Sequence, residues 1–304
     1  MVVSTEKIAN DLLRERGALY SSRAPQPFAA DLMSHNLRPL FMPYDGMFER
    51  DSGLMKDVWR RGRKLMHRLT MPQMATSYQP IQSLESKKLL YDLLKTPDKY
   101  ETHFERYASG LIFRLAYGKV VESGEESYVR DIVAVNHTVE RVASPGAYLV
   151  DSIPLLMYLP EWLAPFKKEA KVLHERELTL FRSLLYDVKS QMEVDKAPEC
   201  FSRTFWENLD EFDLTVDQGA YVIGTLFEAG SGTTSAAMMS FCLCMCLHPE
   251  WQDRGAKEVT EVCGDSMPEF DDIPQLPLAR AIIKEVMRWR PVTAGGLSHR
   301  HYHS

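Results

Sequence analysis

The stretch LFEAGSGTTSAAMMSF, Leu226 to Phe241, lies inside a long apolar run but has Gly-Ser-Gly-Thr-Thr-Ser at its centre. Within a helix, Gly costs about 1 kcal/mol relative to Ala, and Ser and Thr hydroxyls compete for backbone hydrogen bonds. The surrounding apolar pattern still predicts one helix from Val216 to Leu247. Small residues at spacings of three and four share one face of this helix: Ala229, Gly230, Thr233 and Thr234. Such a face leaves room for something flat and bulky, so the weakened centre indicates a binding site.

The same helix raises the question of a membrane span. The run from Ala229 to Leu247 carries no charge and is long enough to cross a bilayer. Against a span stand its block of Gly, Ser and Thr residues and Glu228 directly before it. A helix that crosses the core of a large globular protein explains the same apolarity. We therefore expect a buried core helix.

Composition and charge exclude several classes of protein. The chain has 304 residues, of which 45% are hydrophobic and 26% charged, as in globular proteins. The net charge is −6, with 36 basic against 42 acidic residues, so no overall basic field favours nucleic acid. The first 17 residues contain no apolar core of signal-peptide length, and neither a signal peptide nor an N-terminal anchor is expected. Five cysteines, three of them in the apolar run, favour a reducing compartment.

Helical periodicity dominates the chain, and strand signals are few and short, so the expected fold class is mainly α. Two connectors are expected to be irregular: Ser21–Asp51, a loop with short strands, and Cys200–Asp213, a polar linker. Ser144–Pro165 is apolar but broken by prolines, and it suits equally a loop packed on the core and a segment resting on a membrane surface. The expected helices are Ser4–Arg16, Lys56–His67, Ser77–Leu94, Lys99–Tyr117, Ser127–Val142, Phe166–Met192, Val216–Leu247, Pro249–Cys263 and Leu276–Arg290.

A second motif is the pair Glu285 and Arg288 in AIIKEVMRWRP. Residues three apart on a helix face the same side and can form a charge-assisted hydrogen bond. The neighbouring residues are mostly apolar, which predicts that the pair is partly buried. The alternative is an ordinary surface pair, worth less than about 1 kcal/mol.

A third motif is the basic turn VWRRGRKLMHRL, which contains no acid. Trp59, Arg63 and His67 fall on one helical face, where their donors suit an anion such as a carboxylate or phosphate. The alternative is a solvated basic face without a ligand.

Together, these segments resemble a cytochrome P450, the haem-thiolate monooxygenase family, of the kind that fungi use in secondary metabolism. FEAGSGTTS is similar to the helix that lies over the haem on the oxygen side, and KEVMRWRP with the later SHR resembles the E-x-x-R helix and the segment after it. DVWRRGRKLMH is similar to the helix that holds the haem propionates, and the run from Gln79 to Gly118 also fits the family.

The resemblance implies haem (heme) as the cofactor and assigns residues to it. Trp59 and Arg63 match donors to the propionates, and His67 matches a helper to them. Ala229 and Gly230 match residues that line the haem groove.

Further roles follow from the same resemblance. Thr233 matches the hydroxyl that assists proton delivery during oxygen activation, and is the implied catalytic residue. Glu285 and Arg288 match a structural pair that organises the core beside the haem. Gly232 departs from the pattern, because the family usually has an acid there, so one candidate proton relay is missing.

The cysteines also depart from the pattern. The family's haem-ligating cysteine follows the E-x-x-R helix, whereas all five cysteines here precede Glu285 and the sequence ends at SHRHYHS. Cys242 and Cys246 share a helical face while Cys244 points away, so they cannot close a metal site, and we expect buried thiols that act as small hydrophobic residues. We therefore expect residues 1–304 to form a single, incomplete domain of this family, without its N-terminal anchor and haem-cysteine region.

The implied activity is the insertion of one oxygen atom into an apolar small molecule, in fungal secondary metabolite biosynthesis. NADPH-cytochrome P450 reductase is the implied electron donor, and the cytoplasmic face of the endoplasmic reticulum membrane is the implied location, with peripheral membrane contact. Two alternatives remain open: a catalytically silent truncated fragment, and a helical scaffold or membrane-associated interaction protein.

Overall fold

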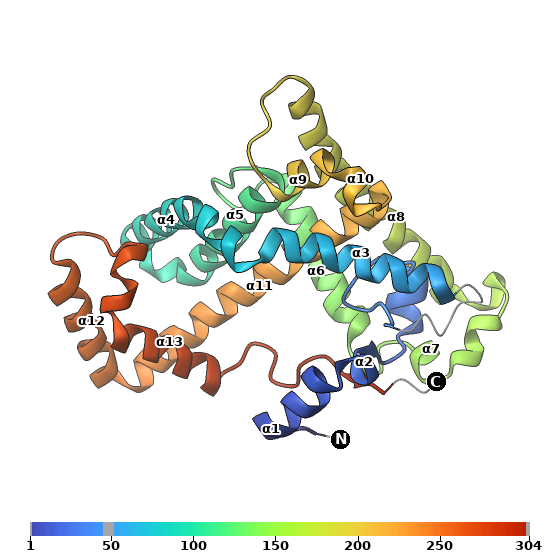
Figure 1. The fold of residues 1–304 in the computed structure, drawn as a ribbon, viewed down its shortest axis with the longest axis horizontal. Coiled ribbons are helices and arrows are strands. Elements are labelled where there is room, and N and C mark those ends of the chain that lie inside the picture. Colours follow the sequence, from blue (N-terminus) through green and yellow to red (C-terminus); the bar gives the residue numbers. More distant parts are fainter. Residues whose placement is uncertain (1, 45–51, 302–304) are drawn as a thin grey trace.

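The computed structural model describes residues 2–44 and 52–301, with side chains from residue 57 onward in the second range. The fold is mainly helical, as expected, and its longer helices are α3 (Ser52–Thr70), α4 (Pro72–Lys95), α5 (Tyr100–Tyr117), α6 (Ser127–Ala143), α8 (Pro165–Glu193), α11 (Val216–Leu247), α12 (Pro249–Cys263) and α13 (Pro277–Trp289). Figure 1 shows α11 running diagonally through the molecule, with α12 and α13 gathered at its C-terminal end.

Shorter elements connect these helices. They are α1 (Glu6–Ala9), α2 (Gly17–Tyr20), α7 (Leu149–Ser152), α9 (Phe201–Glu207) and α10 (Leu209–Phe212), π-helical turns at Asn10–Glu15 and Pro27–Met33, and 3₁₀ turns at Pro97–Lys99, Pro154–Tyr158, Glu161–Leu163 and Phe270–Gln275. Strands β1 (Ser22–Arg23) and β2 (His299–Arg300) pair antiparallel, with Ser22 opposite Arg300 and Arg23 opposite His299. This pairing joins the N-terminal region to the segment that follows α13.

The main core surrounds the first half of α11. A capping box begins the helix, because the Thr215 hydroxyl accepts a hydrogen bond from the backbone N–H of Gln218 while the Gln218 side chain accepts one from the Thr215 N–H. Phe227 packs on Phe113 of α5, with ring centroids 4.5 Å apart. Gly224 lets Phe181 of α8 approach closely, since a Cβ there would lie 2.6 Å from the Phe181 ring. Burial of these aromatic rings fixes the position of α11.

Two of the expected connectors differ in the structure. Cys200–Asp213 is not a polar linker but contains α9 and α10, because Phe201, Phe205 and Phe212 turn into the main core. The described part of Ser21–Asp51 contains β1, as expected, and also the buried π-helical turn Pro27–Met33, while residues 45–51 lie outside the described residues. The pattern over Ser4–Arg16 folds as α1 followed by a π-helical turn.

The proline-broken segment Ser144–Pro165 contains α7 and two short 3₁₀ turns. Its large apolar side chains are largely exposed, among them Leu155, Tyr158 and Trp162 at 75%, 86% and 76%. Val150 is buried in a small cluster with Phe28 and Ala170, and Tyr148, Leu156 and Met157 pack against the same cluster. The segment thus packs on this small cluster through some side chains and leaves many of its large apolar side chains exposed, which leaves both expectations open.

The second half of α11 also differs from expectation. Residues from Tyr221 to Phe227 are almost all buried, whereas Ala229, Gly232, Thr233 and several later residues are exposed. A fully buried core helix is therefore correct for the first half and wrong for the second, because α12 and α13 contact only part of its surface. Within the described chain, α11 is the one helix whose length and apolarity would also allow a membrane span.

Candidate functional site: the α11 groove

The weakened centre of α11 presents an open face. Ala229, Gly232 and Thr233 are exposed together, and a Cβ added at Gly232 would meet no atom within 4 Å. Gly230 was expected on the same open face. Instead it faces α5, because a Cβ added to Gly230 would lie 3.0 Å from Ile112. Its missing side chain thus serves the packing of α11 on α5, and the open face is formed by the other three residues.

The Thr233 hydroxyl is held by the helix itself. Its Oγ1 donates a hydrogen bond to the carbonyl oxygen of Ala229, one turn earlier, at 2.5 Å, as the sequence predicts. The donor hydrogen is thereby used within the helix, and the hydroxyl oxygen keeps acceptor capacity. Thr233 therefore presents an acceptor on the open face.

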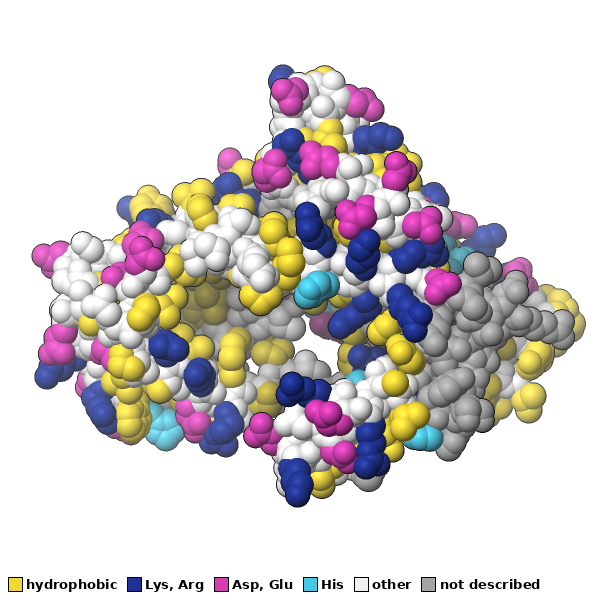
Figure 2. Space-filling model, in the orientation of Figure 1, with side chains coloured by type: hydrophobic (Ala, Val, Ile, Leu, Met, Phe, Trp, Pro, Cys, Tyr) yellow, Lys and Arg dark blue, Asp and Glu magenta, His cyan; other side chains and the backbone are white. Residues whose placement is uncertain are grey.

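The basic turn lies on α3, which crosses α11 at Gly62. A Cβ added to Gly62 would lie 3.3 Å from Val222 of α11. Val222 is two turns before Ala229, so the basic turn and the open face border the same region of the molecule. Figure 2 shows a hollow there, with Lys and Arg side chains on its rim.

Trp59, Arg63 and His67 occupy the exposed or half-exposed side of α3. The Arg63 guanidinium lies over the Trp59 ring, 5.8 Å from its centroid, and the Tyr44 ring meets the Trp59 ring edge-on with centroids 5.0 Å apart. Neighbouring cations have other partners, since Arg61 pairs with Asp213 and Lys64 lies 3.1 Å from Glu211. The basic turn is therefore divided, with Arg61 and Lys64 tying α3 to the α10 region and Arg63 held against Trp59.

Arg23 is a further residue near the basic turn, and no sequence motif points to it. Burial, and then the positive charge of Arg63, lower the pKa of Arg23, so the two guanidinium groups are close enough to repel. Arg23 is held there by the β1–β2 pairing and a 3.4 Å hydrogen bond to the Leu297 carbonyl. Arg23 is half-buried and Arg63 is exposed, and two neighbouring cations suit an anion that contacts both. Arg23 is 40 positions from Arg63, and no local motif joins them.

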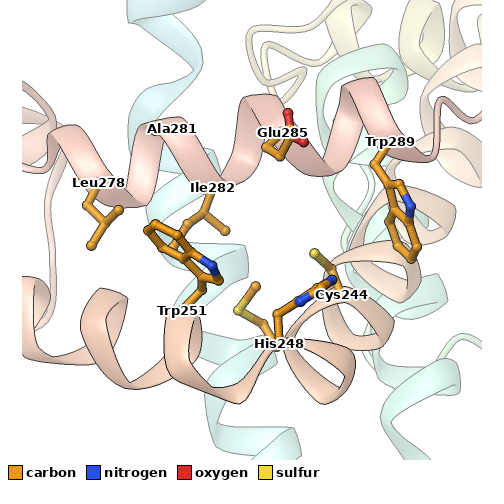
Figure 3. A pocket seen from close by; sticks show the side chains of 9 residues that line it. Cys244, His248, Trp251, Leu278, Ala281, Ile282, Glu285 and Trp289 are labelled. Carbon is orange, nitrogen blue, oxygen red and sulfur yellow. The ribbon is translucent and has the colours of Figure 1, made fainter.

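Glu285 and Arg288 form the expected pair, with Arg288 nitrogens donating to both Glu285 oxygens at 2.6 and 2.7 Å. Their hydrogen bond lowers the pKa of Glu285. The expected burial is wrong, because their side chains are 58% and 70% exposed while Val286 turns inward instead. Glu285 lies at the edge of a pocket of about 380 Å³ between α11, α12 and α13, as Figure 3 shows.

The cysteines of α11 are less buried than expected. Cys242 and Cys244 are half-buried and Cys246 is exposed, because this end of α11 is covered on one side only. Cys244 lines the pocket of Figure 3 together with His248 and Trp251. Across residues 2–44 and 52–301, no group of three or more His, Cys, Asp or Glu residues is arranged to hold a metal ion.

A buried ion cluster, also not foreseen, lies directly before the open face. Arg38 donates hydrogen bonds to Glu177 of α8 and to Glu228 of α11, and its side chain is 0% exposed. Tyr221 donates to the second Glu177 oxygen at 2.9 Å. Loss of water around Glu228 raises its pKa to about 7, against the lowering effect of Arg38.

Comparisons with known proteins agree with this architecture. The Cytochrome P450 family model matches residues 32–303. Cytochrome P450 monooxygenase fogE of Aspergillus ruber is 33% identical over 300 residues, which cover 98% of this chain and 54% of fogE. Cytochrome P450 monooxygenase virE of Hypocrea virens is 31% identical over 300 residues, which cover 98% of this chain and 52% of virE. The chain thus spans about half the length of these curated relatives.

The fold is similar to that of solved structures as well. A zebra fish cytochrome P450 with progesterone superimposes with a TM-score of 0.72 at 23% identity, covering 95% of this chain and 65% of that one. Another structure of a zebra fish cytochrome P450, with abiraterone, superimposes with a TM-score of 0.67 at 20% identity. This match covers 96% of this chain and 64% of that one. The chain belongs to the cytochrome P450 family.

Proposed function

We propose that this chain supplies the oxygen-side and propionate-side walls of a haem-dependent monooxygenase that oxidises an apolar small molecule in fungal secondary metabolism. The observation that carries the proposal is the open face of α11, where Ala229, Gly232 and Thr233 leave space for a flat group. The fungal relatives are named as cytochrome P450 monooxygenases, which supports the same reaction class.

The residues of α3 and α11 fit the propionate edge and one face of a haem, and they include no thiolate ligand for its iron. Its two propionates need cationic and hydrogen-bonding donors, which the Arg63 guanidinium over the Trp59 indole and the Arg23 guanidinium, whose pKa Arg63 lowers, would supply. Haem, when bound, supplies the oxygen-activating chemistry. Arg63 and Trp59 would orient it, with His67 nearby on the same face of α3, and Ala229 would let it approach α11.

Thr233 would act as the positioned hydroxyl of this groove. Because its hydrogen is donated to Ala229, its oxygen is oriented to accept a hydrogen bond from a group on the open face. A neighbouring acid is missing at Gly232, so any proton that passes Thr233 must come from another group. Electrons would come from a partner, and NADPH-cytochrome P450 reductase is the partner we propose.

Haem titration followed by absorbance tests the proposal. Arg63→Ala should weaken haem binding roughly tenfold or more, because it removes a charge-assisted contact. Ala229→Trp should block the open face and weaken haem binding further. Arg254→Ala is the matched control, since Arg254 also stacks over a tryptophan, Trp251 on α12, 4.1 Å from its centroid. Equal affinities in all four proteins would contradict the proposed groove and favour a scaffold role.

We further propose that the segment from α7 to Pro165 rests on the cytoplasmic face of the endoplasmic reticulum membrane. Its exposed Leu155, Tyr158 and Trp162 form an apolar surface suited to the lipid interface. Binding to neutral-lipid vesicles should persist in high salt and should drop in Trp162→Ser. Release of the wild-type chain by salt alone would show that charge, not this apolar surface, makes the contact.

A further inference from the structure

The ion cluster before the groove has unequal numbers of charges. One cation, Arg38, lies between two carboxylates, Glu177 and Glu228. Their side chains are 0%, 1% and 12% exposed, so water compensates little of the excess negative charge. Burying an uncompensated charge is costly, and a carboxyl group in such a place tends to keep its proton.

The two carboxyl groups differ in their hydrogen bonds. Glu177 accepts from Arg38 on Oε1 and from the Tyr221 hydroxyl on Oε2, so both of its oxygens are stabilised as an anion. Glu228 accepts from Arg38 on Oε2, but its buried Oε1 has no hydrogen-bond partner among the described residues. An extra proton is therefore best placed on Oε1 of Glu228.

Other titratable groups near the cluster come from α5, α8 and α11. From α5, the buried Tyr117 hydroxyl is close enough to Glu228 that this carboxyl raises its pKa, after burial, the larger cause. From α8, His174 Nδ1 lies 2.8 Å from the Met33 carbonyl oxygen and 3.2 Å from the Tyr221 hydroxyl, and the His35 ring stacks on the His174 ring with centroids 3.7 Å apart. From α11, Tyr221 is already donating to Glu177.

The position of Glu228 relates this chemistry to the groove. Glu228 directly precedes Ala229 on α11, and Gly232 lies one turn later on the same side of the helix. That side is open at Gly232. The acid and the open face are thus adjacent parts of one helix.

We propose that Glu228 holds an exchangeable proton beside the α11 groove at neutral pH, and that Arg38 and Glu177 position it there. The use of that proton by a group in the groove rests on the proposed function, whereas its presence on Glu228 does not. The raised pKa of Glu228, about 7, supports this assignment.

The first test is the pH dependence of unfolding, compared between the wild-type chain and Glu228→Gln without haem. Between the ordinary pKa of 4.5 and about 7, folded Glu228 keeps a proton that the unfolded chain has released. Folding stability should therefore fall as pH rises through this window, by at most about tenfold in the folding constant per pH unit relative to Glu228→Gln. A flat difference across this window would overturn the proposal.

Two further variants locate the proton. In Glu177→Gln, the excess negative charge is gone, so Glu228 should ionise at lower pH and the slope should move to lower pH. A slope that disappears in Glu177→Gln but persists in Glu228→Gln would place the proton on Glu177 and overturn the assignment. Glu85→Gln is a matched control, because Glu85 is also buried, with 2% of its side chain exposed, but accepts hydrogen bonds from Arg106 and Arg114 on separate oxygens.

Infrared spectroscopy gives a second measurement, which does not require that Glu228→Gln folds. The wild-type chain should show the carbonyl band of a protonated carboxyl group up to about neutral pH, and Glu228→Asp should change the position of this band. Transfer to D₂O should shift the band within the mixing time if the proton exchanges. A band that is missing at pH 6, or that does not shift in D₂O, would show that Glu228 holds no exchangeable proton. Loss of haem binding alone, with these signals intact, would contradict only the proposed function.

Discussion

The two halves of α11 have similar apolar composition but opposite surroundings. The first half, to Phe227, is enclosed by α3, α5, α8 and α9, whereas the second half leaves a face open from Ala229 onward. Glycine serves both halves: Gly224 admits the Phe181 ring, while at Gly232 there is only space. Apolarity and glycine content therefore do not distinguish a packed helix from a helix with an open face, because the difference depends on which elements lie opposite.

The largest expected contrast between the halves comes from removing one phenylalanine in each. Phe227 is 0% exposed and Phe241 is 41% exposed. Phe227→Ala should reduce the free energy of unfolding by about 3–5 kcal/mol, because it leaves a cavity in the main core. Phe241→Ala should cost less than about 1 kcal/mol. Urea unfolding followed by circular dichroism measures both, and similar losses would show that the second half is as enclosed as the first.

A smaller contrast comes from one glycine in each half, because replacing each by alanine should change the free energy of unfolding in opposite directions. Gly224→Ala places a Cβ 2.6 Å from Phe181 and should destabilise the chain by about 1–3 kcal/mol through overpacking. Gly232→Ala adds a Cβ to open space and should stabilise α11 by up to about 1 kcal/mol, from helix propensity alone. The same unfolding experiment checks the signs. Destabilisation by Gly232→Ala would mean that the face is occupied by protein atoms.

The contrast also explains what the sequence could predict. Long periodic segments, such as those of α5, α8 and α11, were recognised because burial of one face repeats along the helix. The short helices α9 and α10 were missed, since three aromatic residues in a polar segment, Phe201, Phe205 and Phe212, become core only when other helices surround them. Tertiary packing, not local pattern, formed them.

The candidate site residues also divide into those with a local signal in the sequence and those without one. Thr233 and the Trp59–Arg63 pair were recognisable because each lies in a local motif. Arg38 could not be recognised from the sequence, because its carboxylate partner Glu228 is 190 residues away and no spacing rule reaches that far. Long-range charge partners depend on the fold, so the sequence gives no sign that Glu228 is unusual.

The smallest expected effect concerns the pair beside the open half, Glu285 and Arg288. The sequence predicted a partly buried pair whose disruption would be costly, but both side chains are mostly exposed. Water and salt screen such pairs, and exposed pairs contribute little to stability. Glu285→Ala should therefore lower the midpoint of thermal unfolding by only about 2 °C or less.

The matched control is Glu261→Ala on α12, which removes an exposed acid 3.7 Å from Lys257. The two variants should behave alike, and 1 M salt should reduce both losses. A loss for Glu285→Ala far beyond that of Glu261→Ala would mean that the pair is enclosed in solution, and hence that this end of the molecule is covered as the first half of α11 is.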